Sequence, residues 1–214
     1  MAEILNLKSQ HFHLLPEKAV WWEESKTFLI SDIHLGKISH FRREGIAVPD
    51  AMIADNFKRL DHLISKLSTK KIIFLGDLFH HRMNIEWNIF TEWRMKNKNI
   101  EMNIVLGNHD IIPKKEFHSH GIQPYSELIT GNFRFSHFPS EEIPENLFSF
   151  CGHVHPVFRL TSARQSVKLP CFAFTKQQLI LPSFGSFTGG YTMAPESAEV
   201  FYLIAENSVI PFRP

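Results

Sequence analysis

Five apolar stretches of the chain each run directly into side chains that can bind metal ions. In open α/β sheets, ligand sites lie beyond the carboxyl ends of the strands. If the five stretches are strands, their ends can therefore meet in one place. The side chains are Asp32 and His34 after TFLIS, Asp77 after KIIFLG, Asn108 after MNIVLG, His137 after FRFS, and His153 and His155 after LFSFCG.

The types and spacing of these ligands indicate two metal ions rather than one. Residues two apart on an extended chain point to the same side, so both members of D-x-H and of H-x-H can face one metal cluster. Mixed carboxylate and imidazole ligands suit Mn, Fe or Zn better than Ca or Mg. Seven ligands are too many for one tetrahedral ion and suit two ions that share a carboxylate. Two ions about 3.5–4 Å apart can activate a bridging hydroxide for in-line attack on phosphorus.

Each motif has a simpler explanation when it stands alone. An Asp behind a strand, as in SDIH or FLGD, is more often a turn or helix-cap residue. GNHD and GHVH are stronger signals because they leave several neighbouring polar groups in need of partners. All the motifs follow apolar stretches, and chance explains that arrangement poorly. We therefore interpret the seven residues as one ligand set.

Composition places the chain among ordinary soluble proteins. Its 214 residues suit a single domain over 1–214, with 43% hydrophobic and 21% charged residues. The net charge of +1 provides no global field to attract nucleic acid or an acidic membrane. We expect no secretory signal and no membrane span, and two cysteines make no disulfide framework, so a reduced, cytoplasmic setting is expected.

The elements that must position the ligands can be read from periodicity. Strands are expected at 20–22 and 27–31, followed by a helix in which Ile53, Phe57, Leu60, Ile64 and Leu67 share one face. KIIFLG and MNIVLG read as buried strands, with a helix over 84–98 between them. From about residue 124, short strands alternate with turns, which favours an antiparallel region. We expect an α/β fold in which two sheets pack face to face with helices outside.

The ordered motifs SDIHLG, GDLFHH, GNHD, SHF and GHVH resemble those of the calcineurin-like metallophosphoesterase superfamily. That resemblance implies a two-sheet β-sandwich flanked by helices (αββα) and a dinuclear metal centre. It also implies His109 as the catalytic acid that protonates the leaving oxygen, with Asp110 orienting that region. The implied ligands are Asp32, His34 and His155 for one ion, Asn108, His137 and His153 for the other, and Asp77 as the bridge.

Two further segments, HLGKISHFRREGIAVP and LPSFGSFTGG, resemble the ligase-associated DNA damage response endonuclease family (PdeM). This resemblance implies a DNA endonuclease in DNA repair, associated with a DNA ligase and helicase system. Mn²⁺ is then the expected metal, with Fe or Zn as alternatives. His80 and His81 stand where the protein phosphatase branch has an Asp-Arg pair, which argues against a phosphoprotein phosphatase.

Basic side chains near two of the motifs are candidates for contacts with substrate phosphates. The alternative is a solvated basic turn, and the sequence does not separate the two interpretations. The candidates for substrate binding are Lys37, Arg42, Arg43, His80, His81 and Arg82.

Two other functions remain open. The same chemistry suits a small nucleotide or nucleotide-lipid substrate, although no insertion large enough for a lipid-binding cap is evident. A binding scaffold on this fold is the third reading. A scaffold has no evident physical reason to keep a costly cluster of desolvated polar groups.

Overall fold

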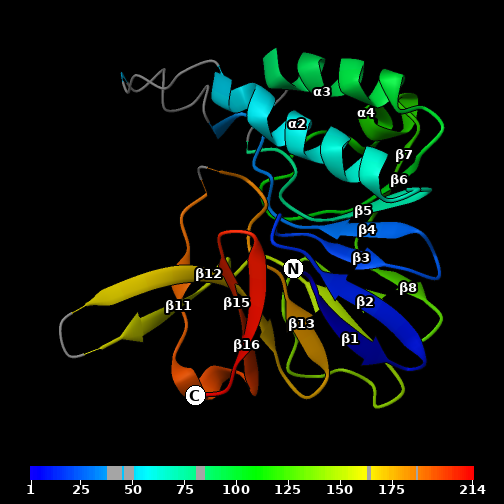
Figure 1. Ribbon diagram of the computed structural model, residues 1–214. Helices are drawn as coiled ribbons and strands as arrows, with labels where there is room; N and C mark the ends of the chain where they lie inside the picture. Colours follow the sequence, from blue (N-terminus) through cyan, green and yellow to red (C-terminus); the bar gives the residue numbers. More distant parts are fainter. Residues whose placement is uncertain (38–44, 46–50, 81–84, 163–164, 187) are drawn as a thin grey trace.

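The computed structural model describes every residue except 38–44, 46–50, 81–84, 163–164 and 187, and it leaves out the side chains of 51–53. The first half of the chain forms a seven-stranded sheet in the order β1-β2-β3-β4-β5-β6-β7 (Figure 1). β1 to β4 pair antiparallel, whereas β4 to β7 pair parallel. The strands are β1 (Glu3–Leu7), β2 (Gln10–Leu14), β3 (Val20–Trp22), β4 (Thr27–Ile30), β5 (Lys71–Leu75), β6 (Glu101–Val105) and β7 (Ile122–Tyr125).

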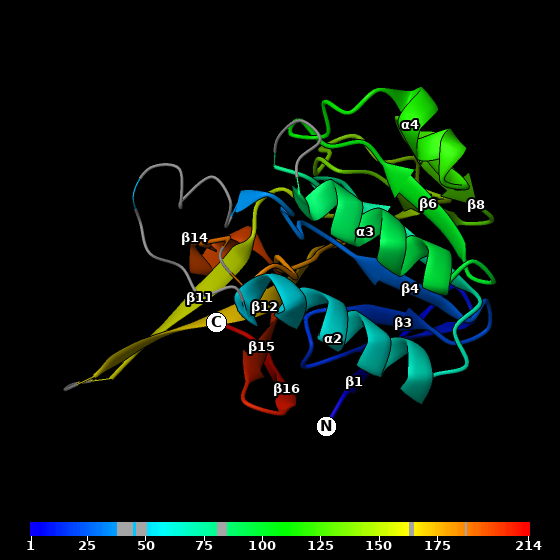
Figure 2. The same cartoon turned by 90° about the horizontal axis from the view of Figure 1, so that it is seen from above.

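The helices α2 (Ala51–Lys66), α3 (Ile85–Lys96) and α4 (Lys114–Ser119) lie in the connections between the parallel strands. They cover the outer face of the seven-stranded sheet (Figure 1, Figure 2). Phe57 and Leu60 of α2 pack with Ile72 and Phe74 of β5 in the cluster between helices and sheet. This arrangement follows from the sequence, because the apolar residues of α2 recur at spacings of three and four.

The second half forms a nine-stranded sheet in the order β14-β11-β12-β13-β10-β9-β8, with β15 pairing to β12 and β16 to β15. A short 3-10 helix, η1 (Pro195–Ser197), precedes β15. The strands are β8 (Leu128–Thr130), β9 (Phe133–Phe135), β10 (Phe148–Cys151), β11 (Pro156–Thr161), β12 (Ser166–Phe174), β13 (Gln178–Ile180), β14 (Tyr191–Thr192), β15 (Val200–Ala205) and β16 (Ser208–Phe212).

The two sheets pack on each other through an aromatic core. Ile73 and Leu75 point to the opposite face of β5 from Ile72 and Phe74, and they belong to this core between the sheets. The ring of Phe12 lies 4.9 Å from that of Phe133 and 4.7 Å from that of Phe150, so it joins one sheet to the other. Burial of each such side chain contributes about 1.5–3 kcal/mol relative to exposure. The packing of this core fixes the position of one sheet on the other, and with it the relative positions of their strand ends.

The expected two-sheet α/β sandwich is confirmed, but the α-helices among the described residues cover only the first sheet and not both sheets as αββα implies. The expected pairing in the second sheet is also corrected. The second half is not simply antiparallel, because β10 pairs parallel with both β9 and β13, and β11 pairs parallel with β14. Turn signals alone cannot distinguish a hairpin from a longer connection between parallel strands. The parallel pairing has a consequence for the ligands, since β9 and β10 end at the same edge. Among the residues described, no helix combines the length and apolar character needed to cross a bilayer.

Candidate dinuclear metal centre

The seven predicted ligands come together where strand ends of both sheets meet. β4, β5 and β6 are parallel neighbours and precede Asp32, Asp77 and Asn108, while the parallel pair β9 and β10 precedes the histidines of the second sheet. Potential donor atoms form two groups, and within each group they lie within 4.8 Å of one another. The first group is Asp32, His34 and His155, and the second is Asp77, His137 and His153.

The Asp77 carboxylate belongs to the second group and also lies close to the first. Its Oδ2 is 3.6 Å from Nε2 of His34 in the first group and 3.5 Å from Nε2 of His137 in the second. Asn108 belongs beside the second group, because its Oδ1 is 3.2 Å from the same nitrogen of His137. One carboxylate oxygen of Asp77 thus lies close to a histidine of each group. The geometry therefore fits two metal sites that share Asp77.

The backbone brings the ligands together in a way that differs from our expectation. Asp32 (φ 53°), His34 (φ 51°), Asp77 (φ 48°), His153 (φ 69°) and His155 (φ 52°) all adopt the left-handed conformation. The D-x-H and H-x-H pairs are therefore not extended, and the alternation of a strand does not explain why both members face the centre. Each left-handed non-glycine residue costs of order 1–3 kcal/mol and persists only where surrounding structure imposes it.

Glycines before three of the motifs leave room for ligands from neighbouring strands. A Cβ atom on Gly76 would lie 2.2 Å from His137 Nδ1, and one on Gly107 would lie 2.2 Å from Asp77 Oδ1. On Gly152 it would lie 2.5 Å from Asp32 Oδ2. These separations are far below van der Waals contact. The glycine of each G-D, G-N and G-H pair is thus a packing requirement of a ligand on another strand.

Hydrogen bonds orient several ligands. His137 Nδ1 lies 2.9 Å from the carbonyl oxygen of Leu75, which can only accept, so Nδ1 carries the hydrogen and Nε2 keeps its lone pair. Oδ2 of Asp32 accepts from the backbone amide of His153 at 3.0 Å and from the Ser31 hydroxyl. Histidine ligands in metal sites are commonly fixed by such second hydrogen bonds.

Three buried atoms of the first group that could coordinate a metal ion have no hydrogen-bond partner among the described residues. They are Asp32 Oδ1, His34 Nε2 and His155 Nε2. Asp32 Oδ1 and His155 Nε2 are 3.0 Å apart but are not aligned as a hydrogen bond. Leaving a buried polar atom unpaired costs about 1–3 kcal/mol. A cation coordinated by all three atoms would remove that cost, so the residues present fit a bound metal.

The protonation states of these side chains also suit metal binding. Burial lowers the pKa of His34 to about 3. Burial and the neighbouring His137 lower the pKa of His153. Burial alone would raise the pKa of Asp32, but His155 and Ser31 outweigh it and hold the pKa below its usual value. Metal ligands must be neutral imidazole or ionised carboxylate, and these shifts favour those forms.

His109, the predicted acid, lies beside the shared carboxylate. Its backbone amide donates to Asp77 Oδ1 at 2.9 Å. Its ring stacks on His80 with centroids 4.9 Å apart and meets His34 edge-on at 5.3 Å. His109 is only half-buried, and Asn108 beside it is exposed. The imidazole is therefore close to the ligands on the side that solvent and substrate can reach.

Asp110 accepts hydrogen bonds from the backbone amides of Phe79 and Gly107, at 3.0 and 2.9 Å. It thereby joins the loop after β5 to the loop after β6. Burial raises the pKa of Asp110 to about 7, a rise that these two amides oppose and the nearby charge of Asp77 reinforces. Its carboxylate contacts backbone rather than the two ligand groups, which fits an orienting role.

Of the candidates for substrate binding, the structure describes Lys37 and His80. Lys37 is half-buried just after the first motif, and its charge helps to lower the pKa of His34. His80 Nδ1 lies 3.3 Å from His34 Nδ1. Both side chains are therefore near the centre. Arg42, Arg43, His81 and Arg82 lie outside the described residues.

Sequence reasoning missed the residues that support Asp32 from behind. Ser183 Oγ donates to the Asp32 carbonyl at 2.8 Å, and the Gly185 amide donates to the same oxygen at 3.2 Å. Arg59 of α2 donates to the Phe184 carbonyl at 2.6 Å and lies over the Phe184 ring. The segment LPSFGSFTGG contained these residues, but only the placement of Ser183 and Gly185 against the first motif reveals their role. Ser31 carried a weak signal, being a polar residue at the buried end of an apolar strand.

The chain is similar to a known protein family and to solved structures. Residues 25–201 match the family model described as calcineurin-like phosphoesterase. The crystal structure of Pseudomonas putida nuclease MPE is similar over 99% of this chain and 100% of that chain, with a TM-score of 0.84 and 30% sequence identity. Yfce, a phosphoesterase from E. coli, aligns over 87% of this chain and 98% of that chain, at 16% identity and a TM-score of 0.46. No protein with a curated description matches the sequence.

Proposed function

The chain belongs to the calcineurin-like phosphoesterase family, and we propose that it is a nuclease that hydrolyses phosphodiester bonds in DNA. Its activity as a metal-dependent phosphoesterase follows from the family. The choice of a nucleic-acid substrate is supported by the full-length similarity to a protein described as a nuclease. The observation that best supports the proposed chemistry is that Asp77 Oδ2 lies between His34 and His137.

The distances between the side chains assign each predicted ligand to one of two ions. Asp32, His34 and His155 would hold one divalent cation, and Asn108, His137 and His153 would hold the other, with Asp77 shared. When bound, two such ions supply an activated water as nucleophile and stabilise the charge that develops on phosphoryl oxygens. We propose Mn²⁺ as the ion, because the mixed nitrogen and oxygen donor set suits it; Fe and Zn suit the same donors.

His109 is the chain's own candidate for proton transfer. Its backbone amide is bonded to Asp77, so its position is fixed relative to the shared ligand. From there the imidazole would donate a proton to the departing sugar oxygen, which a poor leaving group needs. Asp110 would act through position alone, since it holds the loop that carries His109 against the loop after β5.

The test compares three substrates with added Mn²⁺ and with chelator: a chromogenic phosphodiester, the matching monoester and single-stranded DNA. We expect metal-dependent cleavage of the diester and of DNA. The His109→Ala variant should lose on the order of 10²–10⁴-fold in turnover, the usual contribution of general acid–base catalysis. Its metal content should equal that of the wild-type protein.

His118→Ala is the matched control, because His118 is exposed on α4 and its side chain is outside both ligand groups. Loss of metal from His109→Ala would contradict a role in proton transfer. Cleavage of the diester with DNA left intact would instead favour a small nucleotide substrate. Metal-loaded protein without activity on any substrate would favour the scaffold reading over a nuclease.

A role in DNA repair and an association with a DNA ligase and helicase system rest on the motif resemblance. They stay predictions, as does the cytoplasmic setting. Co-purification of the tagged chain with such enzymes after DNA damage is the expected outcome. Recovery of the chain alone under the same conditions would contradict the association.

A further inference from the structure

A β-hairpin made by β11 and β12 projects beyond the body of the two sheets (Figure 1, Figure 2). It begins at the residue after His155, a predicted metal ligand. Its root is anchored on one side by Phe158, which is 5% exposed and packs on Phe201 and Phe212 with centroids 4.6 and 5.0 Å away. Successive side chains of a strand point to opposite faces, so the next residue, Arg159, points to the free face.

The free face of the hairpin carries a pair of like charges. Arg159 lies directly opposite Lys168 in the antiparallel register, and both side chains are exposed. Neither has a carboxylate partner in the part of the chain that the structure describes. Like charges directly opposite each other destabilise a β-ladder. A bound anion between them would relieve this repulsion.

The sequence around the hairpin is depleted of acidic residues. The stretch from 146 to 195 contains no Asp or Glu, and its fully charged side chains are all basic: Arg159, Arg164, Lys168 and Lys176. The whole chain has a net charge of only +1. The segment that contains the hairpin therefore contributes only positive formal charge to a nearly neutral protein, and it includes the predicted ligands His153 and His155.

A cavity of about 180 Å³ is lined both by residues of this hairpin and by the predicted ligand His155. Val157 and Pro170, which also line it, are opposite each other and on the same face as Arg159 and Lys168. Lys18 also lines it. Burial and the nearby charge of Arg59 lower the pKa of Lys18. The cavity thus borders both the free face of the hairpin and a predicted metal ligand.

We propose that a basic tract composed of Lys18, Arg159 and Lys168 binds phosphates of a nucleic-acid strand that flank the bond being cleaved. This inference rests on the proposed nuclease function and adds the path of the strand. Arg159 is four residues beyond His155, on the order of 13 Å along a β-strand. That reach suits a phosphate beyond the scissile one rather than the scissile phosphate itself.

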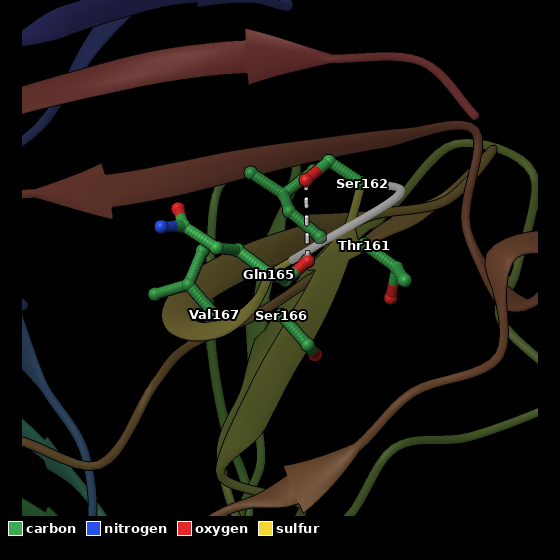
Figure 3. Close-up of a pocket in the computed structure, with 6 residues that line it drawn as sticks. Thr161, Ser162, Gln165, Ser166 and Val167 are labelled. Carbon is green, nitrogen blue, oxygen red and sulfur yellow. Dashed lines mark hydrogen bonds between the residues drawn. The ribbon is translucent and has the colours of Figure 1, made fainter.

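At the outer end of the hairpin, the structure describes the chain on either side of residues 163–164. A hollow there is lined by uncharged residues, and the Ser162 hydroxyl donates to the Gln165 carbonyl across the turn (Figure 3). The residues that line it are Leu160, Thr161, Ser162, Gln165, Ser166 and Val167.

The test measures strand binding separately from catalysis. Fluorescence anisotropy with labelled single-stranded DNA and RNA, in chelator and at several salt concentrations, gives Kd and its salt dependence. The variant is Arg159→Gln together with Lys168→Gln. We expect Kd to rise on the order of tenfold at low salt, and the slope of log K against log salt to fall by about 1–2. Metal-dependent turnover of the chromogenic diester should be unchanged.

Lys96→Gln with Lys98→Gln is the matched control, because both lysines are exposed near the opposite end of β6 from Asn108. It removes the same charge and should leave Kd within about twofold of wild type if binding depends on position. An equal loss of affinity for DNA and for RNA would support contacts with the phosphate backbone of either strand. A loss of affinity for DNA alone would support such contacts with DNA only.

Three results separate the possible failures. Unchanged Kd and slope in the hairpin variant, with wild-type protein that cleaves DNA, would overturn the tract alone. An equal loss in the control variant would also overturn it, because net charge would then explain the binding. Wild-type protein that cleaves the chromogenic diester but neither binds nor cleaves nucleic acid would overturn the proposed function and the tract together.

Discussion

The carboxylate of Asp77 faces histidines of both ligand groups, so its removal changes two metal sites at once. We expect Asp77→Ala to retain at most one ion per chain after purification with Mn²⁺, because neither site keeps its shared oxygen ligand. Metal analysis by mass spectrometry measures this directly. Asp61→Ala is the control, since Asp61 is exposed and its carboxylate bonds Trp93. Full occupancy of both sites in Asp77→Ala would show that another residue bridges them.

Ser31 acts on a ligand without being one. Its hydroxyl donates to Asp32 Oδ2, which leaves Oδ1 for a metal ion. Loss of such a supporting hydrogen bond typically costs 10–100-fold in metal affinity. We expect Ser31→Ala to weaken Mn²⁺ binding by about that factor in a calorimetric titration.

The control for this prediction is Ser149→Ala, which also removes a fully buried hydroxyl from a strand near the centre. Ser149 Oγ has no hydrogen-bond partner among the described residues, so its removal should leave metal affinity unchanged. Equal affinities in the Ser31 variant and the wild-type protein would mean that the backbone amide of His153 alone suffices to orient Asp32.

At the scale of residues, the identity of the candidate ligands could be predicted but their conformation could not. Carboxylate, imidazole and amide side chains behind apolar stretches are visible in the sequence. The left-handed backbone of Asp32 or His153 is not, because single Asp and His residues are far more often found with negative φ. Contacts such as that of Ser183 with the Asp32 carbonyl depend on folding across more than a hundred residues.

At the scale of elements, three strands are each followed by a glycine and then a ligand because the strand ends pack closely against one another. Gly107 leaves no room for a Cβ, which would lie 2.2 Å from Asp77 Oδ1 and 2.5 Å from the Asp77 nitrogen. We expect Gly107→Ala to destabilise the protein by about 1–3 kcal/mol, as overpacking does. It should also reduce metal content, because the shared carboxylate must move. Urea unfolding and metal analysis of the same sample test both effects.

Gly131→Ala is the control for the packing argument. Gly131 lies in the turn between β8 and β9, and a Cβ there would meet nothing, although its φ of 56° makes alanine unfavourable. This variant should lose stability through the backbone alone and keep its metal. Loss of stability without loss of metal in Gly107→Ala would show that the loop after β6 moves instead of Asp77.

The long elements were predictable, and the short ones were not. The helix expected from Ile53 to Leu67 and the strands KIIFLG and MNIVLG are present because their apolar residues repeat over several turns or form continuous runs. β14 is only two residues long and pairs with β11 in parallel, so no local pattern reveals it. The parallel partners of β10 likewise depend on which chain segments the aromatic core brings together.

At the scale of the whole molecule, the candidate centre joins the two sheets. Asp32, His34, Asp77 and Asn108 follow strands of the first sheet, whereas His137, His153 and His155 follow strands of the second. Each ligand group contains residues from both sheets. A bound ion would therefore stabilise the packing of one sheet on the other.

Removing the metal should lower the thermal stability of the entire protein. A site at a metal concentration 100-fold above its Kd stabilises the folded state by about 2.7 kcal/mol. For a chain of this length, that corresponds to a Tm increase of about 5–10 °C. Calorimetry of wild-type protein with Mn²⁺ and with chelator measures the shift, and Asp77→Ala should show a smaller one because it retains fewer ligands. Equal Tm values with and without Mn²⁺, in protein shown to bind it, would mean that the ions do not bind the folded state in preference to the unfolded chain. The centre would then contribute nothing to holding the sheets together.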